Sequence, residues 1–178
     1  MWGTTRAVTA TPTYQPTGAT RAGLDDPSAL PAGFRHLRYR TRIGHGEHVF
    51  EAAGEAIMTW RLHRAVGVRP RPSAPRAAPG VTVVSSVPIP APCVVVWVLE
   101  QEDRAGFGYG TTAGHPFSGE EAFVTSIDAG GDVWFTMAAF SRPARWYTRA
   151  AGPVAPLFQR LYARRMGQVL RRLATAPR

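Results

Sequence analysis

Three side chains stand out as able to do chemistry: His115 and the adjacent carboxylates Glu120 and Glu121. His115 lies in a predicted loop between two strands, and the two glutamates open the second of these strands. Because neighbouring residues of a strand point to opposite faces, one glutamate is expected to face inward and the other outward, and the pattern leaves open which does which. An inward carboxylate beneath an apolar sheet would have a raised pKa, and could act as a general base or bind a cation.

The same side chains also fit a purely structural role, which we favour. His115 and Glu121 would close the loop by hydrogen bonding, and Arg142 or Arg165 would pair with one of the glutamates. Structural ion pairs perturb pKa values as catalytic ones do, so the residue types alone do not establish an active site.

Other classes of site find less support in the sequence. His45 and His48 are three residues apart, without an HExxH motif or a carboxylate partner, so no metal site and no cofactor is expected. Cys93 begins an apolar strand and is expected to be a buried small residue, and Ser141 is not in a nucleophile elbow. The Gly106–Gly110 segment lacks the Lys, the spacing and the following helix of a phosphate-binding loop.

The positive charge of the chain is concentrated at one end. All 21 basic residues are Arg, and the formal net charge is +9. Residues 1–141 hold 12 Arg and 12 acidic residues, whereas residues 142–178 hold nine Arg and no acid. Such asymmetry can indicate a nucleic acid, a lipid or another anionic partner, but a run of charge on a helix is most often its solvated face. Nucleic acid is disfavoured because no known binding motif is present.

Length and composition exclude several classes of protein. With 178 residues, 44% of them hydrophobic, and a single Cys, the chain is expected to form one domain without an internal disulfide. The longest unbroken apolar run, Cys93–Leu99, is seven residues long, against the roughly 20 needed to cross a bilayer. No apolar signal segment is found near the first residue, so a cytoplasmic location is expected. The oligomeric state is left open.

The first part of the chain predicts a leader, a strand and a helix. Residues 1–33, rich in Thr, Pro and Gly, predict an extended leader with turns, followed by a core of residues 34–174. Leu37–Ile43 alternates apolar residues with Arg, as a half-buried strand does. Glu47–Val66 has helical spacing and the order of charges that a helix dipole favours. A Pro-rich loop, Pro70–Pro79, follows.

The stretch of residues 81–142 predicts an antiparallel meander, because its apolar runs are separated by short Gly, Pro or Asp turns. Within Gly106–Gly110 the glycines fall on one face and the aromatic residues on the other, which predicts a curved strand or the close approach of another group. The five expected strands are Val81–Val87, Cys93–Gln101, Gly106–Thr112, Glu120–Ile127 and Val133–Phe140.

The last segment predicts a long amphipathic helix from Pro156 to about Ala174, after a break at Gly152–Pro153. Arg165 and Arg172 fall at the edge of its apolar stripe, where they would snorkel to water or reach an acid or a ligand beneath the helix. The stripe consists of Phe158, Leu161, Tyr162, Met166, Val169, Leu170 and Leu173.

The predicted order is a strand, a helix, five antiparallel strands and a long final helix, which is an α+β arrangement. A curved antiparallel sheet with one apolar face needs a cover, and the final helix is the natural one. This arrangement resembles the helix-grip fold of the START and Bet v 1-like superfamily. The resemblance implies a cavity between the sheet and the C-terminal helix.

Several short segments of the sequence, from about Thr13 to Arg165, resemble segments of the uncharacterised DUF1990 (UPF0548) family and occur in the same order as in that family. The strongest are Ser118–Phe123, Trp134–Phe135 and Phe140–Pro143. That family carries no established activity, so the resemblance implies a fold and no mechanism. One small departure is Thr112–Ala113, where Leu-Pro is expected before Gly-His-Pro. Further matching phrases are Thr13–Tyr14, Gly18–Thr20, Leu30–Leu37, Trp60–Arg64, Gly106–Thr111 and Gly114–Pro116.

The function expected from this fold is the binding of a hydrophobic or amphipathic small molecule in that cavity. Arg142, Arg165 or the inward glutamate would orient the polar end of the ligand. One alternative is an enzyme, cyclase- or hydrolase-like, in which Glu121 and His115 do acid–base chemistry on a polyketide-like or ester substrate. Another is the binding of an anionic polymer or lipid by the Arg-rich C-terminus. The expected aromatic lining is Trp60, Trp97, Tyr109, Phe123, Trp134 and Phe135.

Overall fold

The protein is built on one antiparallel sheet of seven strands. The computed structural model describes residues 10–87, 89–150 and 154–176. Within them the strand order is β1-β7-β6-β5-β4-β3-β2, so β3 to β7 form the predicted meander, β1 adds to its edge at β7, and the two-residue β2, in the segment predicted as a Pro-rich loop, adds to its edge at β3. The first strand and the five strands of the meander are present as predicted, with their ends shifted by a few residues. The strands are β1 (Arg35–His45), β2 (Arg71–Pro72), β3 (Thr82–Val87), β4 (Ile89–Glu100), β5 (Arg104–Thr111), β6 (Phe117–Ile127) and β7 (Asp132–Pro143).

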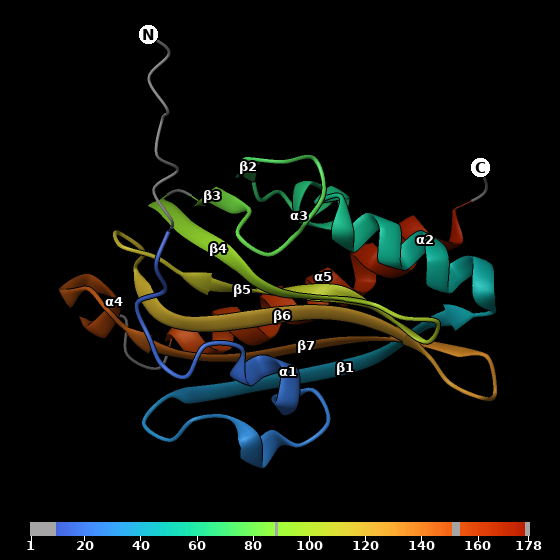
Figure 1. Cartoon of the computed structure of the whole chain (residues 1–178), viewed down its shortest axis with the longest axis horizontal. Coiled ribbons are helices and arrows are strands. Elements are labelled where there is room, and N and C mark those ends of the chain that lie inside the picture. The colour runs from blue at the N-terminus through green and yellow to red at the C-terminus, as the bar shows by residue number, and fades with distance from the viewer. Residues whose placement is uncertain (1–9, 88, 151–153, 177–178) are drawn as a thin grey trace, which may run out of the picture.

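Different elements cover the two faces of the sheet (Figure 1). The helices α2 (Glu47–Met58) and α5 (Val154–Thr175) pack on one face, which we call the inner face, and form with it the main core. The leader, with the short helix α1 (Ala19–Gly23), crosses the opposite, outer face. This curved sheet gripping a C-terminal helix is the predicted helix-grip fold. No helix in the described parts of the chain is long and apolar enough to cross a membrane.

The first strand has one apolar and one basic face, as the sequence predicts. Leu37, Tyr39 and Ile43 contribute to the inner core, and the arginines between them are exposed. One of these, Arg40, lies over the ring of Trp134 at 3.9 Å from its centroid. The alternation of residue types therefore determines which side of β1 meets the helices.

The predicted single helix over Glu47–Val66 is wrong in one respect, because the helix breaks at Trp60. This residue has a left-handed φ of 64° between α2 and α3 (Arg61–Ala65). Such a conformation costs a residue with a side chain of order 1–3 kcal/mol. It places the indole, which is fully buried, in the inner core, where its Nε1 donates to the Ala74 carbonyl oxygen at 3.3 Å.

A bulge in β4 decides which face Trp97 occupies. The pairing with β5 shifts between Val95 and Trp97. As a result Val95 belongs to the inner core, while Val96 and Trp97 both pack on the outer face. Strict alternation would have placed Trp97 on the same side as Val95, so the bulge reverses the expectation that Trp97 faces the C-terminal helix.

The leader forms α1 and a 3₁₀ turn at Pro27–Ala29 in addition to the predicted turns, and its residues 1–9 lie outside the described residues.

Two glycines of β5 make room for aromatic side chains on the outer face of the sheet. A Cβ at Gly110 would overlap the Tyr14 ring of the leader, and one at Gly108 would overlap the Trp97 indole. The close approach predicted from the alternating glycines is thus made by aromatic rings of the protein itself.

The C-terminal helix is longer than predicted and less covered at its start. α5 begins at Val154, two residues before Pro156, and the break predicted at Gly152–Pro153 lies outside the described residues. Its C-terminal half is buried against the sheet, but Phe158 and Leu161 of the predicted apolar stripe are 62% and 54% exposed. The first turns of α5 therefore border open space, where the sequence predicts packing.

Candidate functional site

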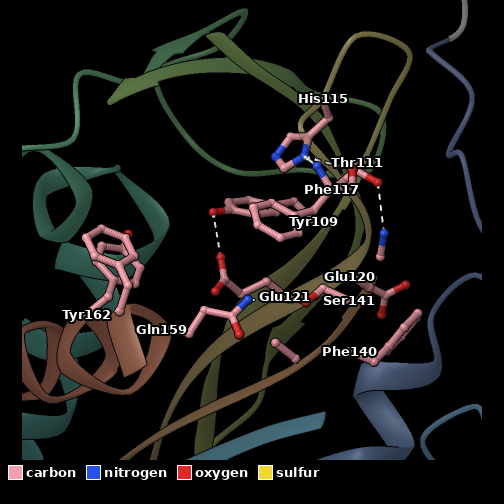
Figure 2. Close-up of a pocket in the computed structure, with 13 residues that line it drawn as sticks. Tyr109, Thr111, His115, Phe117, Glu120, Glu121, Phe140, Ser141, Gln159 and Tyr162 are labelled. Carbon is pink, nitrogen blue, oxygen red and sulfur yellow. Dashed lines mark hydrogen bonds between the residues drawn. The ribbon is translucent and has the colours of Figure 1, made fainter. Parts of the chain in front are cut away.

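A cavity of about 400 Å³ lies between the sheet and the first turns of α5 (Figure 2). Strands β5, β6 and β7 form one wall, and residues of α5 form the other. The walls are mostly apolar with a few polar groups, which is typical of pockets for small molecules. The lining residues are Tyr109, Thr111, His115, Phe117, Gly119, Glu120, Glu121, Ala139, Phe140, Ser141, Phe158, Gln159 and Tyr162.

Glu121 presents its carboxyl group to this cavity from β6 (Figure 2). Its Oε2 accepts a hydrogen bond from the Tyr109 hydroxyl at 2.9 Å, and the two residues are paired across β5 and β6. Burial raises the pKa of Glu121 to about 7, although the hydrogen bond from Tyr109 lowers it in part. The group is therefore partly ionised near neutral pH and is able to give or to take a proton.

Near neutral pH, the other groups around Glu121 whose pKa values are shifted stay uncharged. Burial lowers the pKa of His115 to about 4, so its ring is neutral. Burial and the nearby Glu121 charge raise the pKa values of Tyr109, Tyr162 and the Cys93 thiol well above neutral. Among these groups, Glu121 is the one whose charge changes near pH 7.

Glu120 points the other way and holds the leader against the outer face. Its Oε2 accepts hydrogen bonds from the Tyr14 hydroxyl at 2.6 Å and from the Gly18 backbone N–H at 2.7 Å. Its Oε1 accepts from the backbone N–H of Thr20 at 3.0 Å and from the Thr20 hydroxyl. The indole N–H of Trp97 donates to the same oxygen at 3.2 Å. The alternation of β6 left open which glutamate faces inward, and the structure shows that it is Glu121.

His115 borders the same cavity, and no hydrogen bond within the described residues joins it to Glu121. Its Nδ1 lies 2.9 Å from both the backbone N and the backbone O of Phe117. The ring therefore closes the turn before β6 through the backbone. Figure 2 shows the Tyr109 ring between the imidazole and the Glu121 carboxyl group.

Behind Tyr109 lies a buried cluster of rings around His63. The imidazole is 1% exposed and meets Phe123 edge-on at 4.7 Å, with Phe107 at 5.8 Å and Tyr109 at 6.1 Å between ring centroids. Neither ring nitrogen has a hydrogen-bond partner among the described residues. Burial lowers the pKa of His63 to about 3, so the ring is neutral.

Most of the aromatic residues expected to line the cavity lie elsewhere. Of the six, Tyr109 lines it. The other five are divided between the two faces of the sheet by the broken helix, the β4 bulge and the alternation of β6 and β7. The inner core holds Trp60, Phe123 and Phe135, and the outer face holds Trp97 and Trp134.

Neither arginine expected to orient a ligand reaches the cavity. Arg142 is exposed, and its guanidinium lies 4.9 Å from the centroid of the Phe34 ring, which packs in the outer-face cluster. Arg165 is exposed on α5. Neither forms an ion pair with Glu120 or Glu121 in the part of the chain that the structure describes. The lining residues of the cavity therefore include two glutamates, of which Glu121 presents its carboxyl group to the space, and no arginine.

Two residues of α5, Gln159 and Tyr162, line the cavity although the sequence pattern did not assign them to it. Gln159 and Tyr162 are three residues apart, so they lie on the same side of α5. The Nε2 of Gln159 donates to the Ser141 Oγ at 3.2 Å and ties the helix to β7. The helical spacing around Tyr162 was a usable signal, but it does not show that a helix stands off the sheet. Within the described ranges, no group of three or more His, Cys, Asp or Glu side chains could hold a metal ion.

Solved structures with a similar fold include norcoclaurine synthase from Thalictrum flavum. A truncated form gives a TM-score of 0.56 at 8% identity, and the match covers 84% of this chain and 98% of that one. The enzyme in complex with dopamine and hydroxybenzaldehyde gives a TM-score of 0.52 at 7% identity, covering 82% of this chain and 90% of that one. At such low identity the likeness establishes the helix-grip fold alone.

Two relatives resemble the chain over most of its length. A UPF0548 protein from Deinococcus radiodurans is 35% identical over 178 residues, which cover 92% of this chain and 87% of the relative. A UPF0548 protein from Arabidopsis thaliana is 27% identical over 148 residues, covering 78% and 72%. The family DUF1990, described as a domain of unknown function, matches residues 13–169. The chain therefore belongs to the DUF1990 (UPF0548) family.

Proposed function

We propose that this protein binds a small amphipathic molecule in the cavity between the sheet and α5. The observation that carries the proposal is the cavity itself, about 400 Å³ with largely apolar walls and the Glu121–Tyr109 pair at its polar side. Apolar pockets with a few placed polar groups are the usual sites of small ligands.

The exposed start of α5 supports an entrance at this end of the helix. Leu157, Phe158 and Leu161 are 59%, 62% and 54% exposed, and Phe158 also lines the cavity. Clustered exposed apolar side chains commonly mark a binding site, and here they would cover the apolar part of a ligand. Norcoclaurine synthase, which has the same fold, is known in complex with dopamine and hydroxybenzaldehyde.

Native mass spectrometry of the purified protein, followed by denaturing extraction, tests the proposal. The expected result is a small molecule in stoichiometric amount that is lost in an Ala139→Leu variant. Ala139 lines the cavity opposite Glu121 in the β6–β7 pairing, so a larger side chain there would fill the space. Ala144→Leu, at an exposed position after β7, is the matched control and should retain the molecule. A bare protein that also binds no apolar dye in an Ala139-dependent manner would overturn the proposal.

A second candidate function is acid–base catalysis in the same cavity, because the pKa of Glu121 is raised by burial to about 7. Glu121 would transfer the proton with Tyr109 as its hydrogen-bonded partner, on a polyketide-like or ester substrate. His115 takes a smaller part in this version than the sequence predicts, since its ring is neutral and contacts the backbone of Phe117. Glu121→Gln should abolish turnover of such substrates with little change in melting temperature, and a large loss of stability would instead mark the residue as structural.

Binding of an anionic polymer or lipid by the Arg-rich C-terminal segment stays a prediction, as do the cytoplasmic location and the single-domain organisation. The arginines of α5 are exposed, and Arg178 lies outside the described residues. Because contacts with phosphate release counterions, such binding must weaken steeply with salt. Vesicle binding that is unchanged in high salt would contradict this prediction. The arginines concerned are Arg160, Arg164, Arg165, Arg171 and Arg172.

A further inference from the structure

We propose that the ligand of the cavity carries a cationic amine, which pairs with Glu121 while its apolar part fills the space beneath α5. This inference rests on the proposed function and names the class of molecule. Glu121 presents a carboxyl group to the cavity, and no arginine is among the lining residues. The two arginines that the sequence offered as partners, Arg142 and Arg165, are exposed elsewhere.

When ionised, Glu121 has no counter-charge among the described residues. Its Oε2 accepts the hydrogen bond from Tyr109, and its Oε1 has no hydrogen-bond partner in the described parts of the chain. Glu121 is half-buried by the cavity walls, and a carboxylate that loses part of its hydration without gaining a partner is costly. An anionic ligand would add a second negative charge, and a neutral one would leave the first uncompensated. A cation compensates it directly.

The remaining walls also suit a cation. The faces of aromatic rings attract positive charge, and aromatic side chains of β5, β6 and α5 line the same cavity as the Glu121 carboxyl group. An ammonium group has three donors and no acceptor. The unused Oε1 of Glu121 accepts one of these donors, and Gln159, which projects into the same space, keeps its carbonyl oxygen as a second acceptor because its Nε2 is used by Ser141. The aromatic side chains concerned are Tyr109, Phe117, Phe158 and Tyr162.

The pairing makes binding depend on pH in a definite direction. An alkyl amine stays charged up to about pH 10, as Lys does, so the group that must change is Glu121, with a pKa raised by burial to about 7. The titratable groups that face it are Tyr109 from β5, Cys93 from β4, Tyr162 from α5 and His115 from the loop, and all four stay neutral around pH 7. Amine affinity should therefore rise as the pH rises through 7.

Calorimetric titration with octylamine, octanol and octanoate tests the inference, because the three probes share a chain length and differ in charge. Octylamine is expected to bind about tenfold more tightly than octanol at about pH 8, with octanoate weakest. This advantage should shrink at about pH 5.5, where Glu121 is protonated. In Glu121→Gln both the advantage and its pH dependence should vanish, while octanol still binds. Glu51→Gln, an exposed carboxylate on α2, is the control of equal charge and should behave as the wild type does.

The outcomes separate this inference from the proposed function. If octanol or octanoate binds as tightly as octylamine, the amine assignment is overturned and small-molecule binding stands. An amine advantage that survives in Glu121→Gln also overturns the assignment. If none of the three probes binds, the assignment falls, and the native mass spectrum and dye titration of the Ala139→Leu variant decide the proposed function separately.

Discussion

Glu120 and Glu121 are neighbours on β6, yet their surroundings on the two faces of the sheet are opposite. On the outer face Glu120 is 3% exposed and accepts five hydrogen bonds, from the leader and from Trp97. On the inner face Glu121 accepts one hydrogen bond, from Tyr109, and borders a cavity. The first carboxyl group is saturated with donors, and the second retains unused acceptors beside open space.

A structural carboxylate and one placed for binding differ in what the fold loses when each is removed. Removing Glu120 would leave several buried donors unpaired, so its contribution is to the fold. Burial raises the pKa of Glu121, which means that its ionised form opposes folding. A residue that costs stability at neutral pH and faces a cavity is better explained by a ligand than by the fold.

The largest expected effect comes from making the same change at both positions. In Glu120→Gln the new amide group meets N–H and O–H donors on whichever oxygen it replaces. We expect the free energy of unfolding to fall by about 3 kcal/mol, since each unsatisfied buried group costs about 1–3 kcal/mol. In Glu121→Gln we expect no loss, or a gain. Urea denaturation at about pH 7.5 measures both, and equal losses would remove the contrast between the two faces.

The next effect is the pH dependence of stability. Because burial raises the pKa of Glu121 from 4.5 to about 7, the folded protein keeps a proton that the unfolded chain has already lost between these values. Relative to Glu121→Gln, the wild type should lose up to about 3 kcal/mol of stability as the pH rises across this window.

Two histidines, the buried His63 and the half-buried His115, affect stability in the opposite direction. The pKa values of His63 and His115 are lowered by burial to about 3 and about 4 from 6.5, so they reduce stability as the pH falls below 6.5. They are present in both proteins, so the difference between wild type and Glu121→Gln in urea unfolding isolates the glutamate. A difference that does not change with pH would contradict the raised pKa.

A smaller effect is expected from removing one hydroxyl on each face. Tyr14→Phe deletes a short, buried hydrogen bond to Glu120 and should cost about 2 kcal/mol. Tyr109→Phe deletes the single hydrogen bond to Glu121 and should cost about 1 kcal/mol or less. It should also raise the pKa of Glu121 further, because that bond lowers it. Thermal unfolding of the two variants gives the comparison, and a larger cost for Tyr109→Phe would reverse it.

The smallest effect concerns His63, whose two buried ring nitrogens have no hydrogen-bond partner among the described residues. Replacing His63 by Leu removes the two unpaired buried nitrogens, and the Leu side chain fills most of the same space in the core. We expect the stability to rise by about 1 kcal/mol near neutral pH. A loss of more than this in urea denaturation would show that the ring contacts with Phe123 and Phe107 outweigh the unpaired nitrogens.

The strand pattern and the fold could be predicted from the sequence because they depend on local alternation. Leu37–Ile43 alternates apolar residues with Arg, and the structure places them on opposite faces as predicted. Features that depend on packing could not be predicted in this way. The left-handed turn at Trp60 and the bulge before Trp97 are single-residue irregularities that the surrounding core stabilises, and each moves an indole away from its expected place.

The site was predictable in its residue types and not in its arrangement. Alternation shows that Glu120 and Glu121 face opposite sides, but only the leader, with Tyr14 and Thr20, decides which one becomes saturated with hydrogen bonds. Likewise the apolar spacing of α5 predicts burial all along the helix. It does not reveal that Phe158 stands over a cavity.

The most direct test of amine binding at Glu121 is an NMR titration of its carboxyl group, with and without saturating octylamine. We expect a pKa of about 7 for Glu121 in the free protein. We expect a lower pKa when the amine is bound, because a nearby cation favours the ionised carboxylate. A pKa near the ordinary value of 4.5 in the free protein, or a raised pKa that saturating amine leaves unchanged, would contradict it.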